Sequence, residues 1–167
     1  MAAWRGGVPE GPLSPLGAVV VVLVVLADQG AKLTALAMLP PRTPVELVPG
    51  LLTLFRVENT GIAFSFLSGG GLPLVVLTVV IALVVAWFWV RATEGGRLAA
   101  IGFALILGGA VGNLIDRVRL GSVVDFLYLH IGDRPLFVFN LADTALTLGP
   151  ILLVLVYLWP AKTGRTA

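Results

Sequence analysis

Two carboxylates stand beside apolar sequence where they could act together on a substrate. Asp125 lies within Val123–Phe126, and Asp143 follows Phe139-Asn140-Leu141-Ala142 about 18 residues later. Close carboxylates in a low-dielectric site do not both ionise readily, so such a pair shares one proton. One carboxylate can then activate water as a general base while the other protonates a carbonyl oxygen. For Asp143 a simpler role, as a cap in the first turn of a helix, stays open.

Further polar residues recur at helical spacing inside apolar sequence. Asp28 and Lys32 are four residues apart, so on a helix they face the same way and can form an ion pair. That pair is either structural, or it positions other site groups or contacts substrate. Asn113 and Arg117 have the same spacing, with Asp116 between them. Arg117 can hold a lipid phosphate, pair with Asp116 or orient a catalytic carboxylate.

Two glycine-containing stretches accompany these polar residues. Asn59-Thr60-Gly61-Ile62-Ala63-Phe64 predicts a turn, which is either an ordinary hairpin or an edge along which an extended peptide docks. Gly108 and Gly112 form a small-xxx-small pattern, which lets a neighbouring helix approach closely.

Composition argues against several other chemistries. The chain has no cysteine and a single histidine, His130, which excludes thiolate catalysis, disulfides and a multi-histidine metal site. We expect no metal and no cofactor, and we expect His130 at the surface or an interface. A net charge of +2 from few ionisable groups does not favour nucleic-acid binding. A serine–lysine hydrolase built on Lys32 is conceivable, but no spacing ties that lysine to Ser65, Ser68 or Ser122.

The elements that must position these side chains are transmembrane helices. Of 167 residues, 58% are hydrophobic and 12% charged, which is too little polar surface for a water-facing globule. A helix needs about 20 mostly apolar residues to cross the hydrocarbon of a bilayer. We therefore predict an all-α membrane protein, a single domain over residues 1–167. Its four helices are expected at about 16–38, 72–90, 98–116 and 141–159.

Alternating helix direction gathers the polar groups at one membrane edge, where residues 39–71 and 117–140 connect the helices. Lysines and arginines divide evenly between the two sides, so charge bias does not give the orientation. Residues 45–66 predict short strands that rest at the interface, because strand edges cannot lie unpaired in lipid. Within 121–138, a strand beginning at Val123 and a short interfacial helix over Phe126–His130 both stay open.

Five motifs together resemble the lipoprotein signal peptidases (signal peptidase II), which are bacterial inner-membrane aspartic proteases. The resemblance runs from Asp28 to about Leu148, and all five motifs occur in order on the predicted four-helix framework. They are Asp28-Gln29-x-x-Lys32, Asn59-x-Gly61-x-Ala63-Phe64, Gly108-Gly109-x-x-Gly112-Asn113-x-x-Asp116-Arg117, Val124-Asp125-Phe126 and Phe139-Asn140-x-Ala142-Asp143.

The resemblance implies a role for each of these residues. Asp125 and Asp143 would be the catalytic pair. The residues that would bind substrate or support the pair are Asp28, Lys32, Asn59, Gly61, Ala63, Asn113, Asp116, Arg117, Asn140 and Ala142. A small extracytoplasmic β-sheet cradle between the first and second helices would cover the site.

The resemblance also implies the substrate and the setting. The substrate would be a prolipoprotein whose lipobox cysteine carries diacylglycerol, and the bond before that cysteine would be cleaved. The site would lie at the outer face of the bacterial cytoplasmic (inner) membrane. Membrane lipids would be the other partners, with no nucleic acid, and we expect a monomer.

A non-enzymatic alternative is a small transporter or a proton- or cation-conducting bundle that uses Asp28, Asp116 and Asp143 as a relay. Polar groups gathered at one membrane edge argue against it, because a conduction path needs polar positions through the whole depth. Thr78 alone interrupts the apolar run of the second helix. The sequence therefore favours a membrane aspartic endopeptidase.

Overall fold

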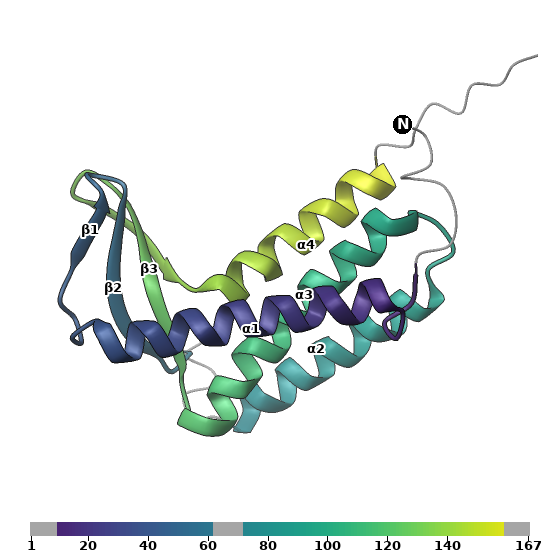
Figure 1. Ribbon diagram of the computed structural model, residues 1–167, viewed down its shortest axis with the longest axis horizontal. Coiled ribbons are helices and arrows are strands. Elements are labelled where there is room, and N and C mark those ends of the chain that lie inside the picture. The colour runs from purple at the N-terminus through teal and green to yellow at the C-terminus, as the bar shows by residue number, and fades with distance from the viewer. Residues whose placement is uncertain (1–9, 62–71, 159–167) are drawn as a thin grey trace, which may run out of the picture.

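Four helices and a small sheet make up the part of the chain that the computed structural model describes, residues 10–61 and 72–158 (Figure 1). The helices are α1 (Pro15–Met38), α2 (Leu72–Arg91), α3 (Gly96–Leu120) and α4 (Leu141–Leu158). Each is long and apolar enough to cross a membrane. The prediction of four such helices is confirmed for these residues. Helix α3 continues four residues past its predicted end, so Arg117 lies on the helix.

Helix α1 begins at a conventional cap and continues through two charged residues. The Ser14 hydroxyl accepts a hydrogen bond from the Gly17 N–H at 3.1 Å, and Pro15 occupies the first helical position. Asp28 and Lys32 are both buried, and their charged groups lie 2.8 Å apart. The predicted ion pair is therefore present, and it offsets part of the cost of placing each charge in apolar surroundings.

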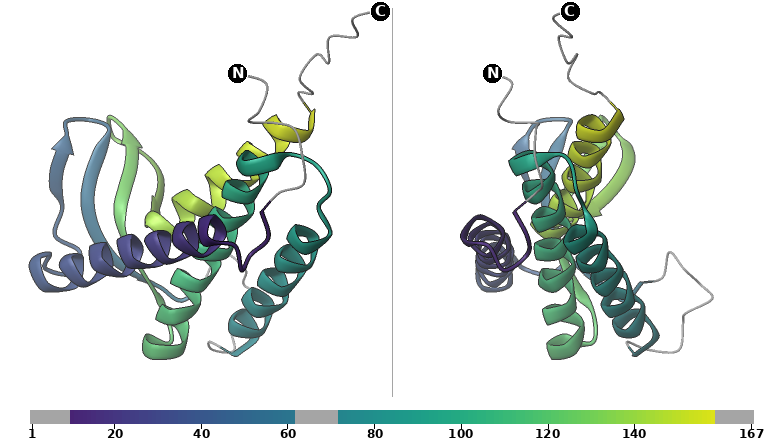
Figure 2. Two further views of the ribbon diagram at one scale, coloured as in Figure 1. Left: turned by 45° about the vertical axis from the view of Figure 1, so that its right-hand side comes forward. Right: turned by 90° about the vertical axis from the view of Figure 1, so that its right-hand side faces the viewer.

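Helix α3 is the central helix of the bundle and packs against α1, α2 and α4 (Figure 2). In its most apolar stretch 56% of the residues are buried, against 11–22% in the other three helices. Glycines make this packing possible: a Cβ on Gly108 would meet Val24 of α1 at 2.7 Å, and one on Gly109 would meet the Ala142 carbonyl of α4 at 2.5 Å. The predicted role of the small-residue pattern is confirmed.

The sheet has four antiparallel strands in the order β1-β2-β3-β4. Strands β1 (Val45–Val48) and β2 (Leu52–Asn59) come from the connection between α1 and α2, where strands were predicted. Strands β3 (Val123–Ile131) and β4 (Arg134–Phe139) come from the connection between α3 and α4. The sheet was predicted only between the first and second helices, so β3 and β4 lie outside that location. Of the two alternatives left open for residues 121–138, the strand beginning at Val123 is confirmed and the short helix over Phe126–His130 is wrong. Pairing with β3 supplies β2 with the hydrogen-bond partners that a strand edge needs near lipid.

The prediction that His130 lies at the surface or an interface is also wrong. Only 8% of the residue is exposed, because β3 turns its ring toward β2. There Nε2 lies 2.9 Å from the Thr53 hydroxyl oxygen, and Nδ1 lies 2.8 Å from the Gly132 carbonyl oxygen. Both ring nitrogens have partners, so burial of this ring leaves no unpaired polar atom.

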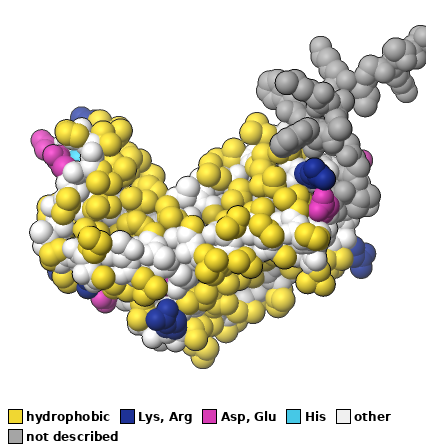
Figure 3. All heavy atoms as spheres, viewed as in Figure 1, with side chains coloured by type: hydrophobic (Ala, Val, Ile, Leu, Met, Phe, Trp, Pro, Cys, Tyr) yellow, Lys and Arg dark blue, Asp and Glu magenta, His cyan; other side chains and the backbone are white. Residues whose placement is uncertain are grey.

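The end of α1, the end of α3 and the start of α4 meet the sheet at one end of the bundle (Figure 1). The Arg56 guanidinium of β2 donates hydrogen bonds to the Leu36 and Leu39 carbonyls at the end of α1, both at 3.0 Å. At the start of α2, Leu74 lies against Gly61, which follows β2. The predicted gathering of these helix ends on one side is confirmed. Apolar side chains cover most of the face shown in Figure 3, and the few charged groups lie toward its edges.

Replacing Gly109 with Ala should lower the free energy of unfolding by about 1–3 kcal/mol, because the new methyl group would press on the backbone of α4. The matched control is Gly30→Ala on α1, where a Cβ meets nothing within 4 Å. That change should leave stability unchanged or raise it by about 0.5–1 kcal/mol. Thermal unfolding in detergent distinguishes the two variants, and equal midpoints would contradict the close α3–α4 approach.

Candidate active site

Asp125 enters the site from strand β3 and is almost completely buried, with 2% of the residue exposed. Each of its carboxylate oxygens accepts a hydrogen bond from a side-chain amide. Asn140 donates to Oδ1 at 2.6 Å, and Asn59 donates to Oδ2 at 3.0 Å. Asn59 reaches it diagonally across the β2–β3 pair, since Val57 is directly opposite Asp125 in the register.

Asp143 enters from the first turn of α4, where it both caps the helix and faces the site. The Asp143 N–H donates to Asn140 Oδ1 at 2.9 Å, while the Asn140 N–H donates to Asp143 Oδ2 at 3.2 Å. This reciprocal pair is a capping box, so the capping role left open by the sequence is real. The other oxygen, Oδ1, accepts from the Asn113 amide of α3 at 2.8 Å. The cap therefore fixes the carboxylate through Oδ2 alone.

All the direct hydrogen-bond donors to these two carboxylates, among the described residues, are neutral amide groups. Burial raises the pKa of Asp125 from 3.8 to about 6, and the negative charge of Asp143 acts in the same direction. The hydrogen bonds from Asn59 and Asn140 and the charge of Lys32 oppose this rise. The site therefore suits a carboxylate pair that carries one proton between two groups.

A buried ionic cluster lies behind the pair and is centred on Lys32. Its Nζ contacts Asp28 Oδ2 at 2.8 Å, Asp116 Oδ2 at 2.9 Å and Asn113 Oδ1 at 2.9 Å. An ammonium group has three N–H donors, so these contacts occupy all of them. Asp116 pairs with Lys32, and its predicted alternative partner, Arg117, has no role in this cluster.

The three charged groups of the cluster, on Asp28, Lys32 and Asp116, each fix a residue that adjoins one of the candidate aspartates in sequence or in space. Asp28 Oδ1 accepts from the Ala142 N–H at 2.9 Å, immediately before Asp143. Asp116 Oδ2 accepts from the Val124 N–H at 3.0 Å, immediately before Asp125. Because Lys32 holds the oxygen of the Asn113 amide, the nitrogen of that amide is the end that faces Asp143. The cluster thus positions both carboxylates without touching them.

Gln29 also belongs to this site, although no role was predicted for it from its motif. Its Nε2 donates to Asp116 Oδ1 at 2.9 Å, to the Gly112 carbonyl at 3.1 Å and to Asp28 Oδ2 at 3.2 Å. The amide therefore bridges two buried carboxylates that share one ammonium group. Its position beside Asp28 in an apolar helix was the available clue, since polar groups at membrane depth need partners.

A cavity of about 290 Å³ opens beside Asp143 between α2, α3 and α4, and Asn59, which donates to Asp125, also lines it. Asp143, Asn113, Arg117, Asn59, Thr78 and the Gly61 backbone contribute its polar lining, and the other lining residues, Leu74, Leu77, Ile81, Ala110 and Leu146, are apolar. The site residues also include Asn140 and Ala142, which are buried behind it, whereas Ala63 lies outside the described residues.

Two backbone and side-chain details shape this cavity. Gly61 has a φ of +83°, which L side chains rarely adopt, and its N–H donates to Asn59 Oδ1 at 2.9 Å. These features belong to the start of the turn predicted over Asn59–Phe64, whose residues 62–64 lie outside the described part of the chain. The Arg117 guanidinium, which makes no hydrogen bond or ion pair within residues 10–61 and 72–158, also lines this cavity.

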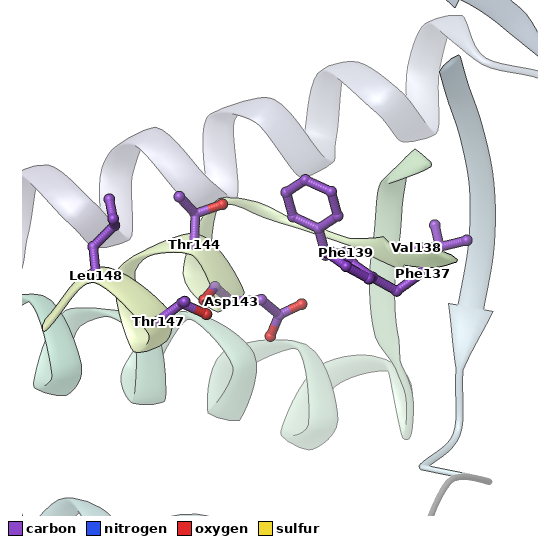
Figure 4. A pocket seen from close by; sticks show the side chains of 7 residues that line it. All are labelled: Phe137, Val138, Phe139, Asp143, Thr144, Thr147 and Leu148. Atoms are coloured by element: carbon purple, nitrogen blue, oxygen red, sulfur yellow. Dashed lines mark hydrogen bonds between the residues drawn. The ribbon is translucent and has the colours of Figure 1, made fainter. Parts of the chain in front are cut away.

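A second cavity, of about 410 Å³, lies on another side of Asp143, between β4 and α4. Figure 4 shows Asp143 between the threonines of α4 and the aromatic side chains of β4. Asp143 is the residue that lines both cavities. The described residues hold no group of three or more His, Cys, Asp and Glu side chains arranged to bind a metal ion.

A family model described as Signal peptidase (SPase) II matches residues 20–159, most of the chain. The chain belongs to the signal peptidase II family. Lipoprotein signal peptidases of Brucella ovis and Brucella melitensis are each 44% identical to it over 139 residues, which cover 81% of this chain and 85% of each relative.

Two solved structures of bacterial membrane enzymes share the fold. One covers 90% of this chain and 92% of its own, with 29% identity and a TM-score of 0.76. The other covers 92% of this chain and 99% of its own, with 28% identity and a TM-score of 0.81. Signal peptidase II enzymes are membrane aspartic proteases that remove signal peptides from prolipoproteins, so the chain is a multi-pass membrane hydrolase. This excludes the transporter alternative as its family function.

The serine–lysine alternative within the hydrolase class fails on the chemistry of Lys32. A general base must reach the serine hydroxyl, but Asp28, Asp116 and Asn113 accept all three N–H groups of the Lys32 amine. Ser122 is buried and makes no hydrogen bond to Lys32, whereas Ser65 and Ser68 lie outside the described residues.

The raised pKa of Asp125 predicts a proton that is lost near neutral pH. The infrared carbonyl band of its protonated carboxyl should disappear as pH rises through about 6, and Asp125→Asn should lack this transition. Between pH 3.8 and about 6 the unfolded carboxyl loses its proton while the folded one keeps it, so the free energy of unfolding should fall as pH rises. A band lost near pH 3.8 would contradict the effect of burial.

Proposed function

We propose that this chain cleaves diacylglyceryl-modified prolipoproteins on the N-terminal side of the lipidated cysteine, with Asp125 and Asp143 as the catalytic pair. The observation that carries the proposal is the arrangement of these two carboxylates. They come from separate elements, and all their hydrogen-bond donors within residues 10–61 and 72–158 are neutral amides. They also stand where the helix ends meet the sheet. Substrate identity comes from the relatives, which are lipoprotein signal peptidases.

The chemical step follows from the different surroundings of the two carboxyl groups. Asp125, whose pKa is raised by burial, is assigned the shared proton and the role of general acid, and Asp143 is assigned the role of general base. Asp143 removes a proton from water as the water oxygen attacks the scissile carbonyl carbon, and Asp125 donates its proton to the carbonyl oxygen. The tetrahedral diol then returns its hydroxyl proton to Asp125. The proton held by Asp143 moves to the amide nitrogen as the C–N bond breaks, which restores the singly protonated pair.

The remaining site residues bind substrate or hold the pair in place. Arg117, Asn113, Asn59 and Gly61 line the smaller cavity and can meet the polar main chain of a peptide there. Ala63 is proposed to belong to this binding surface through the family motif. Asn140 and Ala142 hold the start of α4, and Asp28, Lys32 and Asp116 support both aspartates from behind.

The proposed setting is the outer face of the bacterial cytoplasmic (inner) membrane, where the whole chain acts as one domain and as a monomer. A substrate anchored by two acyl chains stays in the bilayer, so a site at the membrane edge meets it by lateral diffusion. Because the chain has no cysteine, one cysteine placed at Asp133 in the β3–β4 turn can report its side. A membrane-impermeant maleimide should label it in spheroplasts before lysis, and labelling only after lysis would place the sheet in the cytoplasm.

The decisive test of the dyad is cleavage by the Asp125→Asn and Asp143→Asn variants in detergent or liposomes. Each should reduce kcat by roughly a thousandfold or more, because the two groups act as a unit. The matched control is Asp133→Asn, which changes the same type of side chain on an exposed turn and should cleave at the wild-type rate. A chelator is present throughout, since no step above uses a metal.

The substrates are the diacylglyceryl-modified precursor and the unmodified precursor. Cleavage of the modified precursor alone, lost in both dyad variants, is the expected result. Near-normal cleavage by folded Asp125→Asn would mean that the assigned dyad is wrong. Equal cleavage of the two precursors by the wild-type protein would mean that the lipid requirement is wrong.

A further inference from the structure

Helix α2 forms one wall of the smaller cavity, yet little of it is packed against the rest of the protein. Only 11% of its most apolar stretch is buried, and among the described residues it packs mainly against α3. Its two buried residues are Leu74 near its start and Trp89 near its end. Between them lie Leu77, Thr78 and Ile81, which line the cavity. The position of this wall therefore depends on how α2 is held at its two ends.

Trp89 lies on the same face of α2 as the residues that line the cavity. Successive residues of a helix are about 100° apart around its axis. Thr78 comes eleven positions before Trp89, so the two lie only about 20° apart around the helix. Leu74 comes fifteen positions before Trp89 and lies about 60° from it. A rotation or tilt of α2 that displaces Trp89 thus also displaces the cavity wall.

The segment that precedes α1 covers Trp89, which is only 1% exposed. The indole Nε1 donates a hydrogen bond to the Glu10 carbonyl at 2.7 Å. The indole ring stacks on Phe103 of α3, with the ring centroids 5.9 Å apart and the ring planes at 11°. Figure 1 shows this segment, in purple, beside the end of α2 that is farther from the sheet. Trp89 thus joins α2 to α3 and to the N-terminal segment.

Gly17, in the first turn of α1, leaves room for this arrangement. A Cβ at Gly17 would lie 2.8 Å from Trp89 Cη2 and 2.8 Å from the Gly11 carbonyl oxygen. An ion pair between Glu10 and Arg97, at 3.3 Å, also ties the segment to α3, but the Arg97 side chain is 74% exposed and the pair contributes little. The indole hydrogen bond and the packing around the ring therefore hold this end of α2.

We propose that Trp89 and the segment Glu10–Ser14 form a latch that fixes the tilt and rotation of α2 and so keeps the cavity wall in place. Trp89 is then a positioning residue for the reaction, because it acts through α2 and does not itself line the cavity. This role rests on the proposed function, in which the smaller cavity binds a peptide segment of the substrate. The family match begins at residue 20, so part of the latch precedes the matched region.

Two variants weaken the latch from opposite sides. Trp89→Phe removes the indole N–H but keeps an aromatic ring that can stack on Phe103. Gly17→Ala leaves Trp89 unchanged and presses a methyl group against its ring. The matched controls are Trp87→Phe, at a residue that is 54% exposed, and Gly30→Ala, where a Cβ meets nothing within 4 Å.

The position of α2 can be measured without catalysis. Because the chain has no cysteine, nitroxide labels can be attached after Val76→Cys on α2 and Ile151→Cys on α4, at two residues that are about half exposed. Double electron–electron resonance should give a broader distance distribution in Trp89→Phe and in Gly17→Ala than in the unlatched controls' parent protein or in the two controls. Unchanged distributions in both latch variants would overturn the proposal.

Cleavage kinetics distinguish positioning from a simple loss of folded protein. In both latch variants KM for the lipidated precursor should rise roughly three- to tenfold, because fewer molecules hold α2 in the position that binds substrate. The value of kcat should stay within about twofold of wild type, since the dyad lies on β3 and α4. A destabilised protein would instead show a lower kcat with KM unchanged. That pattern, or a wild-type KM where the distances have broadened, would overturn the proposed role.

The two readouts keep failure of the latch distinct from failure of the proposed reaction. The label distances need no substrate, so they test the latch even in a protein that cleaves nothing. A wild-type protein that cleaves neither precursor, with distances that broaden as expected in the latch variants, would contradict the proposed function and support the latch.

Discussion

The site depends on a lysine ammonium that is buried where α1, α3 and α4 meet. Only 2% of Lys32 is exposed, and two buried carboxylates and one amide oxygen occupy its three N–H groups. Each charge alone would be costly at this depth, but each has a partner of opposite sign. Both carboxylates also accept hydrogen bonds from Gln29 and from the backbone, and the ammonium also donates to Asn113 Oδ1. Removal of one member leaves the other charges buried without a partner of opposite sign. The cluster therefore holds three helices and the start of β3 in one arrangement.

This cluster separates the charges that build the site from the carboxylates proposed to act on substrate. Asp28 and Asp116 carry the ion pairs, whereas Asp125 and Asp143 receive hydrogen bonds only from neutral amides among the described residues. A cation bonded directly to either aspartate would favour its ionised form and oppose a shared proton. The close approach that this design needs is supplied at Gly112, where a Cβ would lie 2.7 Å from Asp28 Oδ2.

Much of this arrangement could be predicted from the sequence, because helical spacing and apolar length are local properties. They predicted the four helices, the Asp28–Lys32 pair and the gathering of polar helix ends. The partner of Asp116 could not be predicted, since Arg117 is its neighbour in sequence and Lys32 its neighbour only in space. The sheet was predicted only in part for a similar reason. The sequence left a strand and a short helix open within residues 121–138, and the pairing of β3 with β2, which is distant in the chain, decides between them. Gln29 received no role because its three acceptors come from two different helices.

The most direct test of the claim that the cluster positions the dyad is cleavage by one neutralised variant, Lys32→Met with Asp28→Asn and Asp116→Asn. A buried ion cluster replaced as a whole by neutral side chains usually costs little stability, so this variant should unfold close to the wild-type midpoint. Without Lys32 the Asn113 amide loses its fixed orientation, and kcat should fall roughly a hundredfold. A folded variant that cleaves lipidated precursor at the wild-type rate would contradict the claim.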